Sequence, residues 1–165
     1  MRCARGFTLI ETLIVVLIVG ILASLSVNMF QMHDADRIEG AMRLLERDME
    51  WARSATLTNP DDPAAIRLNT DGSGWIVSRN SSPTVALVAA DGAAMRRTLG
   101  EGGAEAADGV VVTGASNMRV IEFEPFGGVR QAPQSVEASL PDSDYKCLIT
   151  FETGTGNLIK SWSNP

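Results

Sequence analysis

Residues that commonly carry chemistry are scarce in this chain. Cys3 and Cys147 are the only cysteines among its 165 residues, and His33 is the only histidine. The two cysteines are far apart and neither lies in a CxxC or Cys/His cluster, so the sequence offers no zinc site and no disulfide framework. No serine or cysteine nucleophile motif accompanies His33. We therefore expect no enzyme activity and no cofactor.

Basic residues are also few. The chain has 14 Lys and Arg against 20 Asp and Glu, a formal net charge of -6. A nucleic-acid backbone attracts basic surfaces, so we do not expect nucleic acid as a partner. Asp61-Asp62 and the segment 142–144 could offer oxygen ligands to calcium. Neither follows the EF-hand pattern and both lie beside prolines, so we interpret them as solvated turns.

Proline is absent before Pro60, and charge is absent from a long stretch of the same region. From Thr12 to His33, 22 consecutive residues carry no formal charge. As a helix they would span roughly 33 Å, which is enough for the hydrocarbon core of a bilayer. The segment is therefore expected to be a membrane span or a secretion signal.

Charges on either side of this segment predict its orientation. Arg2 and Arg5 precede it, and Asp34 and Asp36 follow it. Positive residues stay on the cytoplasmic side of a membrane helix. We expect a single pass through the inner membrane, with the N-terminus in the cytoplasm and the C-terminal domain in the periplasm.

Two alternatives treat the N-terminus as a removable signal. A signal peptide could end after Ser26, with Ser24 as the second small residue of the cleavage site. The length of the apolar run, the acidic Glu11 near its start and the absence of a turn signal after Ser26 argue against it. A lipoprotein signal fails because no apolar stretch precedes Cys3.

The segment RGFTLIE, from Arg5 to Glu11, resembles the class III leader of type IV pilins and type II secretion pseudopilins. The resemblance implies cleavage by a prepilin peptidase between Gly6 and Phe7, followed by N-methylation of Phe7. It also implies that the apolar helix remains as membrane anchor and filament core. Glu11 matches the glutamate of that family.

Glu11 raises a physical question of its own. A carboxylate in hydrocarbon costs about 2.5–3.5 kcal/mol on insertion scales, so it should have a partner. Cleavage before Phe7 would create an amine, and the amine of a neighbouring subunit could neutralise the carboxylate during assembly. Glu11 would then fix the register of the subunits. Alternatively, Glu11 sits at the level of the lipid headgroups and stays solvated.

Beyond the membrane segment the pattern predicts that the helix continues. Apolar residues recur with spacings of 4, 3, 4 and 3, which places them on one helix face. We expect one helix from Phe7 to about Leu57, ending before Asn59-Pro60. The apolar stripe consists of Ile38, Met42, Leu45, Met49 and Ala52. Charged residues, namely Arg37, Arg43, Glu46, Arg47, Asp48 and Glu50, occupy much of the remaining helix surface.

After Pro63 the pattern changes to short β segments joined by glycine-rich turns. We expect loops at Ala89–Gly109 and Gln131–Asp144. The fold class is α+β and pilin-like: a leader (1–6), a helix (7–58, with 7–32 transmembrane) packed on an antiparallel β-sheet, and a β-rich periplasmic domain (59–165). The expected strands begin at Ala65 and Trp75 and cover Thr84–Val88, Val110–Thr113, Met118–Phe123, Lys146–Glu152 and Leu158–Trp162.

This second half is similar to minor pilins and pseudopilins with the GspH/FimT domain. The matching segments are WARSATLTN from Trp51, a Phe-x-Pro-x-Gly turn, and CLITFETGTGNLIKSW from Cys147. The turn residues are Phe123, Pro125 and Gly127.

The resemblance implies a minor pseudopilin, a structural subunit of the tip or priming complex of a type II secretion pseudopilus. Its partners would be other minor and major pseudopilins or pilins, and the prepilin peptidase would process it. The alternative is a FimT-like minor type IV pilin in pilus assembly or DNA uptake. DNA uptake in that group uses a basic C-terminal segment, whereas the terminal hairpin here offers only Lys146 and Lys160.

Single residues of note have structural interpretations. Cys147 lies in an expected strand, where a buried thiol acts as a small apolar group. We interpret Trp51, Trp75 and Trp162 as core or helix-to-sheet packing rather than as a binding cage.

Overall fold

A computed structural model describes residues 9–152 and 157–163, and for residues 23–33 it describes the backbone alone. The chain divides into two compact units, residues 1–33 and residues 34–165. Among the described residues, no helix is both long and apolar enough to cross a membrane.

One long helix, α1, covers Leu9–Thr58. Its C-terminal end lies where the sequence predicts it, directly before Asn59-Pro60. A residue that precedes proline is pushed out of the helical region, so Asn59 cannot continue the helix easily. The backbone N–H of Asn59 still donates to the carbonyls of Ala55 and Thr56, and the chain then turns into the first strand.

Unit 34–165 contains two antiparallel sheets rather than the single sheet expected from the sequence. A six-stranded sheet has the order β3-β2-β1-β6-β7, with β4 also pairing with β2. A four-stranded sheet has the order β10-β9-β8-β5. The strands are β1 Ala64–Leu68, β2 Gly74–Arg79, β3 Ser82–Ala86, β4 Arg96–Thr98, β5 Val111–Gly114, β6 Val120–Phe123, β7 Val129–Gln131, β8 Ser135–Ser139, β9 Lys146–Phe151 and β10 Leu158–Ser163.

The expectation of two surface loops is wrong in part, because each segment contains regular secondary structure. The segment 89–109 contains β4 and the 3-10 helix η1, Gly102–Ala107. The segment 131–144 contains β8, which pairs with β5 on one side and β9 on the other. A second 3-10 helix, η2, covers Ala115–Asn117. Strand β8 has the sequence SVEAS, in which small and polar residues give only a weak alternation of apolar and polar positions. Val136 and Ala138 are nevertheless buried.

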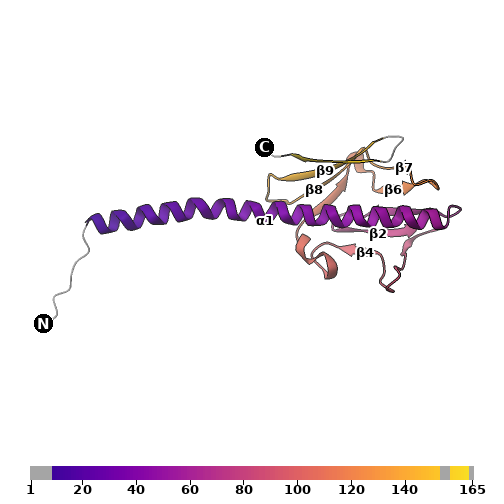
Figure 1. The fold of residues 1–165 in the computed structure, drawn as a ribbon, viewed down its shortest axis with the longest axis horizontal. Helices are drawn as coiled ribbons and strands as arrows, with labels where there is room; N and C mark the ends of the chain where they lie inside the picture. Colours follow the sequence, from indigo (N-terminus) through magenta and orange to yellow (C-terminus); the bar gives the residue numbers. More distant parts are fainter. Residues whose placement is uncertain (1–8, 153–156, 164–165) are drawn as a thin grey trace. The chain divides into compact units, whose positions relative to one another are not determined.

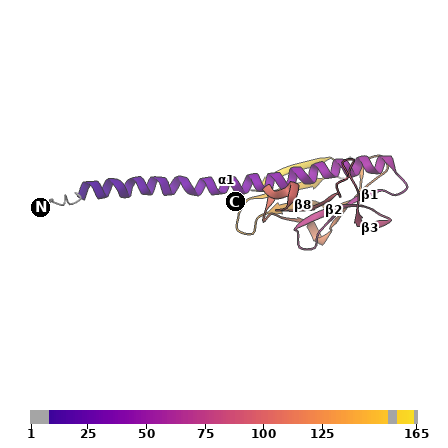
Figure 2. The ribbon, with the colours of Figure 1, turned by 90° about the horizontal axis from the view of Figure 1, so that it is seen from below.

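The core of this unit forms where α1 meets both sheets. Figure 1 shows β8 and β9 along one flank of this part of α1 and β2 and β4 along the other. In Figure 2 the labelled strands β1, β2, β3 and β8 lie on the same side of the helix. The five residues of the predicted stripe are all buried, which confirms the helical period. They pack in one cluster with residues of both sheets, including Ile66, Trp75, Val77, Ile121, Phe123, Val136 and Ile149.

Candidate assembly site

Within unit 1–33, the described part of α1 presents apolar side chains to its surroundings. Each large aliphatic residue from Leu9 to Leu22 is 48–83% exposed in the single chain. Glu11 is exposed among them, in the first described turn of the helix. Soluble monomers rarely expose an apolar surface of this extent, so this surface calls for a lipid or protein partner.

In unit 34–165, the buried carboxylate of Asp48 joins the helix to the six-stranded sheet. The sequence pattern predicts Asp48 to be one of the charged residues on the helix surface. Asp48 is 1% exposed, so that interpretation is wrong. Its Oδ2 accepts hydrogen bonds from Trp75 Nε1 and Arg97 Nε, both at 2.9 Å, and its Oδ1 accepts one from Arg97 Nη2 at 3.1 Å. A buried charge is tolerated when it is paired and hydrogen-bonded in this way. The Asp48 carboxylate in turn raises the pKa of Arg97.

The C-terminal strand is fixed to the same helix by a partly buried ion pair. Lys160 Nζ of β10 donates to Glu39 Oε1 at 2.7 Å, and Arg43 Nε donates to the same oxygen at 2.9 Å. The hydrogen bond from Lys160 lowers the pKa of Glu39. Strand β10 pairs with β9 along its length, which confirms the expected terminal hairpin; its turn, residues 153–156, lies outside the described residues.

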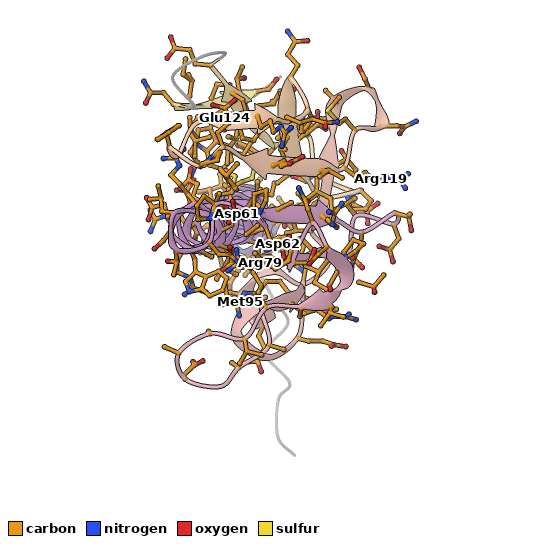
Figure 3. All side chains as sticks on the ribbon, turned by 90° about the vertical axis from the view of Figure 1, so that its right-hand side faces the viewer. Asp61, Asp62, Arg79, Met95, Arg119 and Glu124 are labelled. Carbon is orange, nitrogen blue, oxygen red and sulfur yellow. The ribbon has the colours of Figure 1, made fainter. Side chains whose placement is uncertain are left out.

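The C-terminal end of α1 is capped by Arg79 of β2. Arg79 Nη1 donates to the carbonyls of Ala55 at 3.1 Å and Asp62 at 2.6 Å. The last carbonyls of a helix have no partner within it, and a cation there satisfies them. Figure 3 views this end, with Arg79 and Asp62 close together. The Asp62 carboxylate accepts from the backbone N–H and hydroxyl of Ser81, which lowers the pKa of Asp62.

The Ala-Arg-Ser run of α1 contacts the Phe-x-Pro-x-Gly turn that follows β6. The turn after β6 contains Gly127 with φ +87°, a conformation that favours glycine. The guanidinium of Arg53, from the Ala-Arg-Ser run, lies 5.8 Å from the ring centroid of the buried Phe123. A Cβ built on Gly127 would lie 3.4 Å from the Arg53 side chain. The Arg53 side chain thus packs against both ends of the Phe-x-Pro-x-Gly turn.

Residues 1–27 match the family model described as the prokaryotic N-terminal methylation motif. The match supports a type IV pilin-like chain with a class III prepilin leader. Comparisons with curated proteins and with solved structures gave no match. The chain combines the matched motif with an α+β fold in which a helix packs on antiparallel sheets, which is consistent with a pilin-like fold. A prepilin leader implies processing by a prepilin peptidase and assembly with other pilins.

The predicted cleavage residues of the pilin-like chain, Gly6 and Phe7, lie outside the described residues, as does the side chain of His33. Of the three tryptophans, Trp75 is fully buried and Trp51 packs against the core, which confirms two predictions. Trp162 is 45% exposed, so of the two roles expected for it, core packing or helix-to-sheet packing, the first is wrong. Cys147 is buried as predicted, and burial raises the pKa of its thiol.

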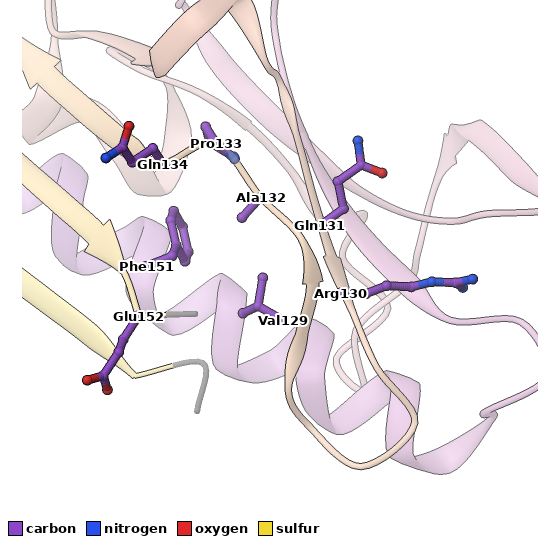
Figure 4. Close-up of a pocket in the computed structure, with 8 residues that line it drawn as sticks. All are labelled: Val129, Arg130, Gln131, Ala132, Pro133, Gln134, Phe151 and Glu152. Atoms are coloured by element: carbon purple, nitrogen blue, oxygen red, sulfur yellow. The ribbon is translucent and has the colours of Figure 1, made fainter. Parts of the chain in front are cut away.

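A cleft of about 510 Å³ lies where the chain passes from the six-stranded sheet to the four-stranded sheet. Figure 4 shows Val129, Ala132 and Phe151 turned toward one another there, with Arg130 directed away. The described residues that line the cleft include no histidine or cysteine and a single acid, Glu152. Among all described residues, no group of three His, Cys, Asp or Glu side chains is placed to hold a metal ion.

Proposed function

We propose that this pilin-like chain is a minor pseudopilin, a structural subunit in the tip or priming complex of a type II secretion pseudopilus. The observation that carries the proposal is the N-terminal methylation motif, followed by a helix that exposes its aliphatic residues around one acid, Glu11. A subunit with this surface gains free energy by burying it in the membrane before assembly and against other helices afterwards.

Processing follows from the same motif. The prepilin peptidase cuts between Gly6 and Phe7, the Phe7 amine is methylated, and residues 7–32 anchor the subunit in the inner membrane with the C-terminal domain in the periplasm. Cleavage also removes two of the 14 basic residues, Arg2 and Arg5, so the mature chain carries 12 basic and 20 acidic residues. That balance supports protein partners over nucleic acid.

Glu11 has the role of a register residue. In the filament its carboxylate pairs with the N-terminal amine of a neighbouring subunit, because an unpaired charge among apolar helices is strongly disfavoured. A misplaced subunit would lose this pairing between subunits. The pairing therefore contributes specificity of assembly more than net stability.

The resemblance of three sequence motifs to the GspH/FimT group supports a minor rather than a major subunit. These motifs serve the packing of α1: Arg53 contacts Phe123 and Gly127, and the terminal hairpin is joined to Glu39 through Lys160. The acidic domain favours secretion over DNA uptake.

The test is Glu11→Gln in the native host, with Glu50→Gln as the matched control, because Glu50 is an exposed acid of the same helix in the other unit. We expect Glu11→Gln to insert and fold at normal levels but to lose protein secretion, while Glu50→Gln secretes normally. Unchanged secretion together with unchanged piliation in Glu11→Gln would refute the role of Glu11. A loss of surface pili with intact secretion would identify a minor type IV pilin instead.

A further inference from the structure

Two arginines face the same side of the six-stranded sheet, away from the helix. Arg67 of β1 is the register partner of Ile76 in β2, and Ile76 is the register partner of Arg96 in β4. Directly paired residues of neighbouring strands share a face of the sheet. The chain neighbours of Arg67, Ile66 and Leu68, belong to the core, so Arg67 and its partners point outward. With strands about 4.8 Å apart, the two arginine backbones are separated by roughly 10 Å.

The two arginines border one surface pocket, which we name the Arg67–Arg96 pocket. Its volume is about 460 Å³. Ile76, which lies between the two arginines in the strand register, and Pro83 contribute apolar surface to the pocket. Hydroxyl and amide groups surround them and can donate or accept hydrogen bonds. The remaining lining residues are Leu68, Asn69, Thr70, Asp71, Thr84 and Thr98.

The two arginines of this pocket differ from other arginines of the domain in that neither is paired with a carboxylate of the described residues. Arg67 donates from Nε to Ser78 Oγ at 3.1 Å and from Nη2 to Asn80 Oδ1 at 2.9 Å, and both acceptors are neutral. Arg96 forms no ion pair with any of the described residues. By contrast, Arg97 pairs with Asp48 and Arg130 with Glu122.

One acid also lines the pocket. The Asp71 carboxylate accepts hydrogen bonds from the backbone N–H of Ser73 at 3.0 Å and from its hydroxyl at 2.7 Å. These bonds lower the pKa of Asp71. The pocket therefore carries two positive charges and one negative charge. The negative charge, on Asp71, already accepts hydrogen bonds from Ser73 in the same turn.

We propose that the Arg67–Arg96 pocket binds a carboxylate side chain from an acidic segment of a partner protein. A guanidinium offers paired N–H donors that match a carboxylate, and the apolar surface of Ile76 accommodates the methylene groups of a glutamate. Two cations are too few for a nucleic-acid backbone, whose proteins typically neutralise several phosphates. The inference does not depend on the proposed secretion function.

The test measures binding of a fluorescein-labelled hexaglutamate peptide to the full-length protein in detergent, by fluorescence anisotropy at low salt. Arg96→Gln is the test variant, because Arg96 is exposed and makes no ion pair within the described chain. Arg119→Gln is the control: it removes the same charge but lies outside the pocket. We expect Arg96→Gln to weaken binding about fivefold, as for a lost charge-assisted contact, and Arg119→Gln to leave it within about twofold.

A second variant tests the pocket in the opposite direction. Asp71→Asn removes the acid and should tighten hexaglutamate binding about twofold to threefold. If Arg96→Gln and Arg119→Gln weakened hexaglutamate binding equally, the loss would reflect the overall charge of the protein, and the proposed site would be refuted. The proposal would also be refuted if hexaglutamate did not bind at low salt, or if a short oligonucleotide of matched charge bound more tightly than the peptide.

Discussion

Replacement of Asp48 by alanine should destabilise the folded domain more than any other single charge removal in α1. Asp48 is 1% exposed and accepts three hydrogen bonds, from Trp75 and Arg97. Removing one partner of a buried ion pair costs about 3–5 kcal/mol, because the other charge is left buried. The Arg97 side chain is 21% exposed, so water recovers part of this loss. We expect a decrease in the free energy of unfolding of about 3 kcal/mol.

The assay is urea unfolding of the full-length protein in detergent, followed by tryptophan fluorescence and far-ultraviolet circular dichroism. Asp48→Asn keeps the shape and one acceptor oxygen, so it should cost about 1–2 kcal/mol. Arg47→Ala is the control: its Nε lies 3.8 Å from Asp48 Oδ1 and its side chain is 60% exposed. It should change stability by less than about 0.5 kcal/mol. Equal stabilities of Asp48→Ala and Arg47→Ala would refute the buried-pair reasoning.

Three further perturbations test other contacts. Because the pKa of Glu39 is lowered by Lys160, this pair stabilises the fold above the ordinary carboxyl pKa of 4.5 and loses its effect as pH falls through the lower folded value. Lys160→Met should therefore cost about 0.5–1 kcal/mol at pH 7 in urea unfolding, and this cost should decrease as pH falls below 4.5; a cost that does not change with pH would contradict the ion pair. Arg79→Met should lower unfolding free energy by about 1–3 kcal/mol and speed amide exchange in the last turn of α1; unchanged exchange there would argue against the cap. With Cys3 replaced by serine, the Cys147 thiol, whose pKa is raised by burial, should react with a disulfide reagent at pH 7 only after unfolding, so rapid labelling of the native variant would show that Cys147 is accessible.

Periodic signals in the sequence predict much of this fold. The apolar residues of the α1 stripe recur at helical spacing, and this spacing alone places them on the face that is buried. Strands β1, β2, β9 and β10 combine apolar residues with glycine-containing turns and were likewise predictable. Strands β7 and β8 were not, because one has three residues and the other draws its stability from pairing on both sides.

The contacts that hold the helix to the sheets could not be predicted in the same way. Asp48 reads as a surface charge because its two partners are remote in sequence: Trp75 is 27 residues away and Arg97 is 49. Lys160 and Glu39 are 121 residues apart. No periodic pattern encodes such pairs, since they depend on how the sheets fold back on the helix. Glu11, by contrast, lies within the matched motif, residues 1–27, and its role in assembly stays a prediction.

The most direct test of the central claim is the intact mass and N-terminal sequence of the mature protein isolated from membranes. We predict that the mature chain starts at Phe7, with a methyl group on the Phe7 amine. That start would establish cleavage after Gly6 and retention of Glu11 in the mature subunit. A start at Val27 would contradict the proposed role in assembly, because the segment that carries Glu11 would then be a discarded signal peptide.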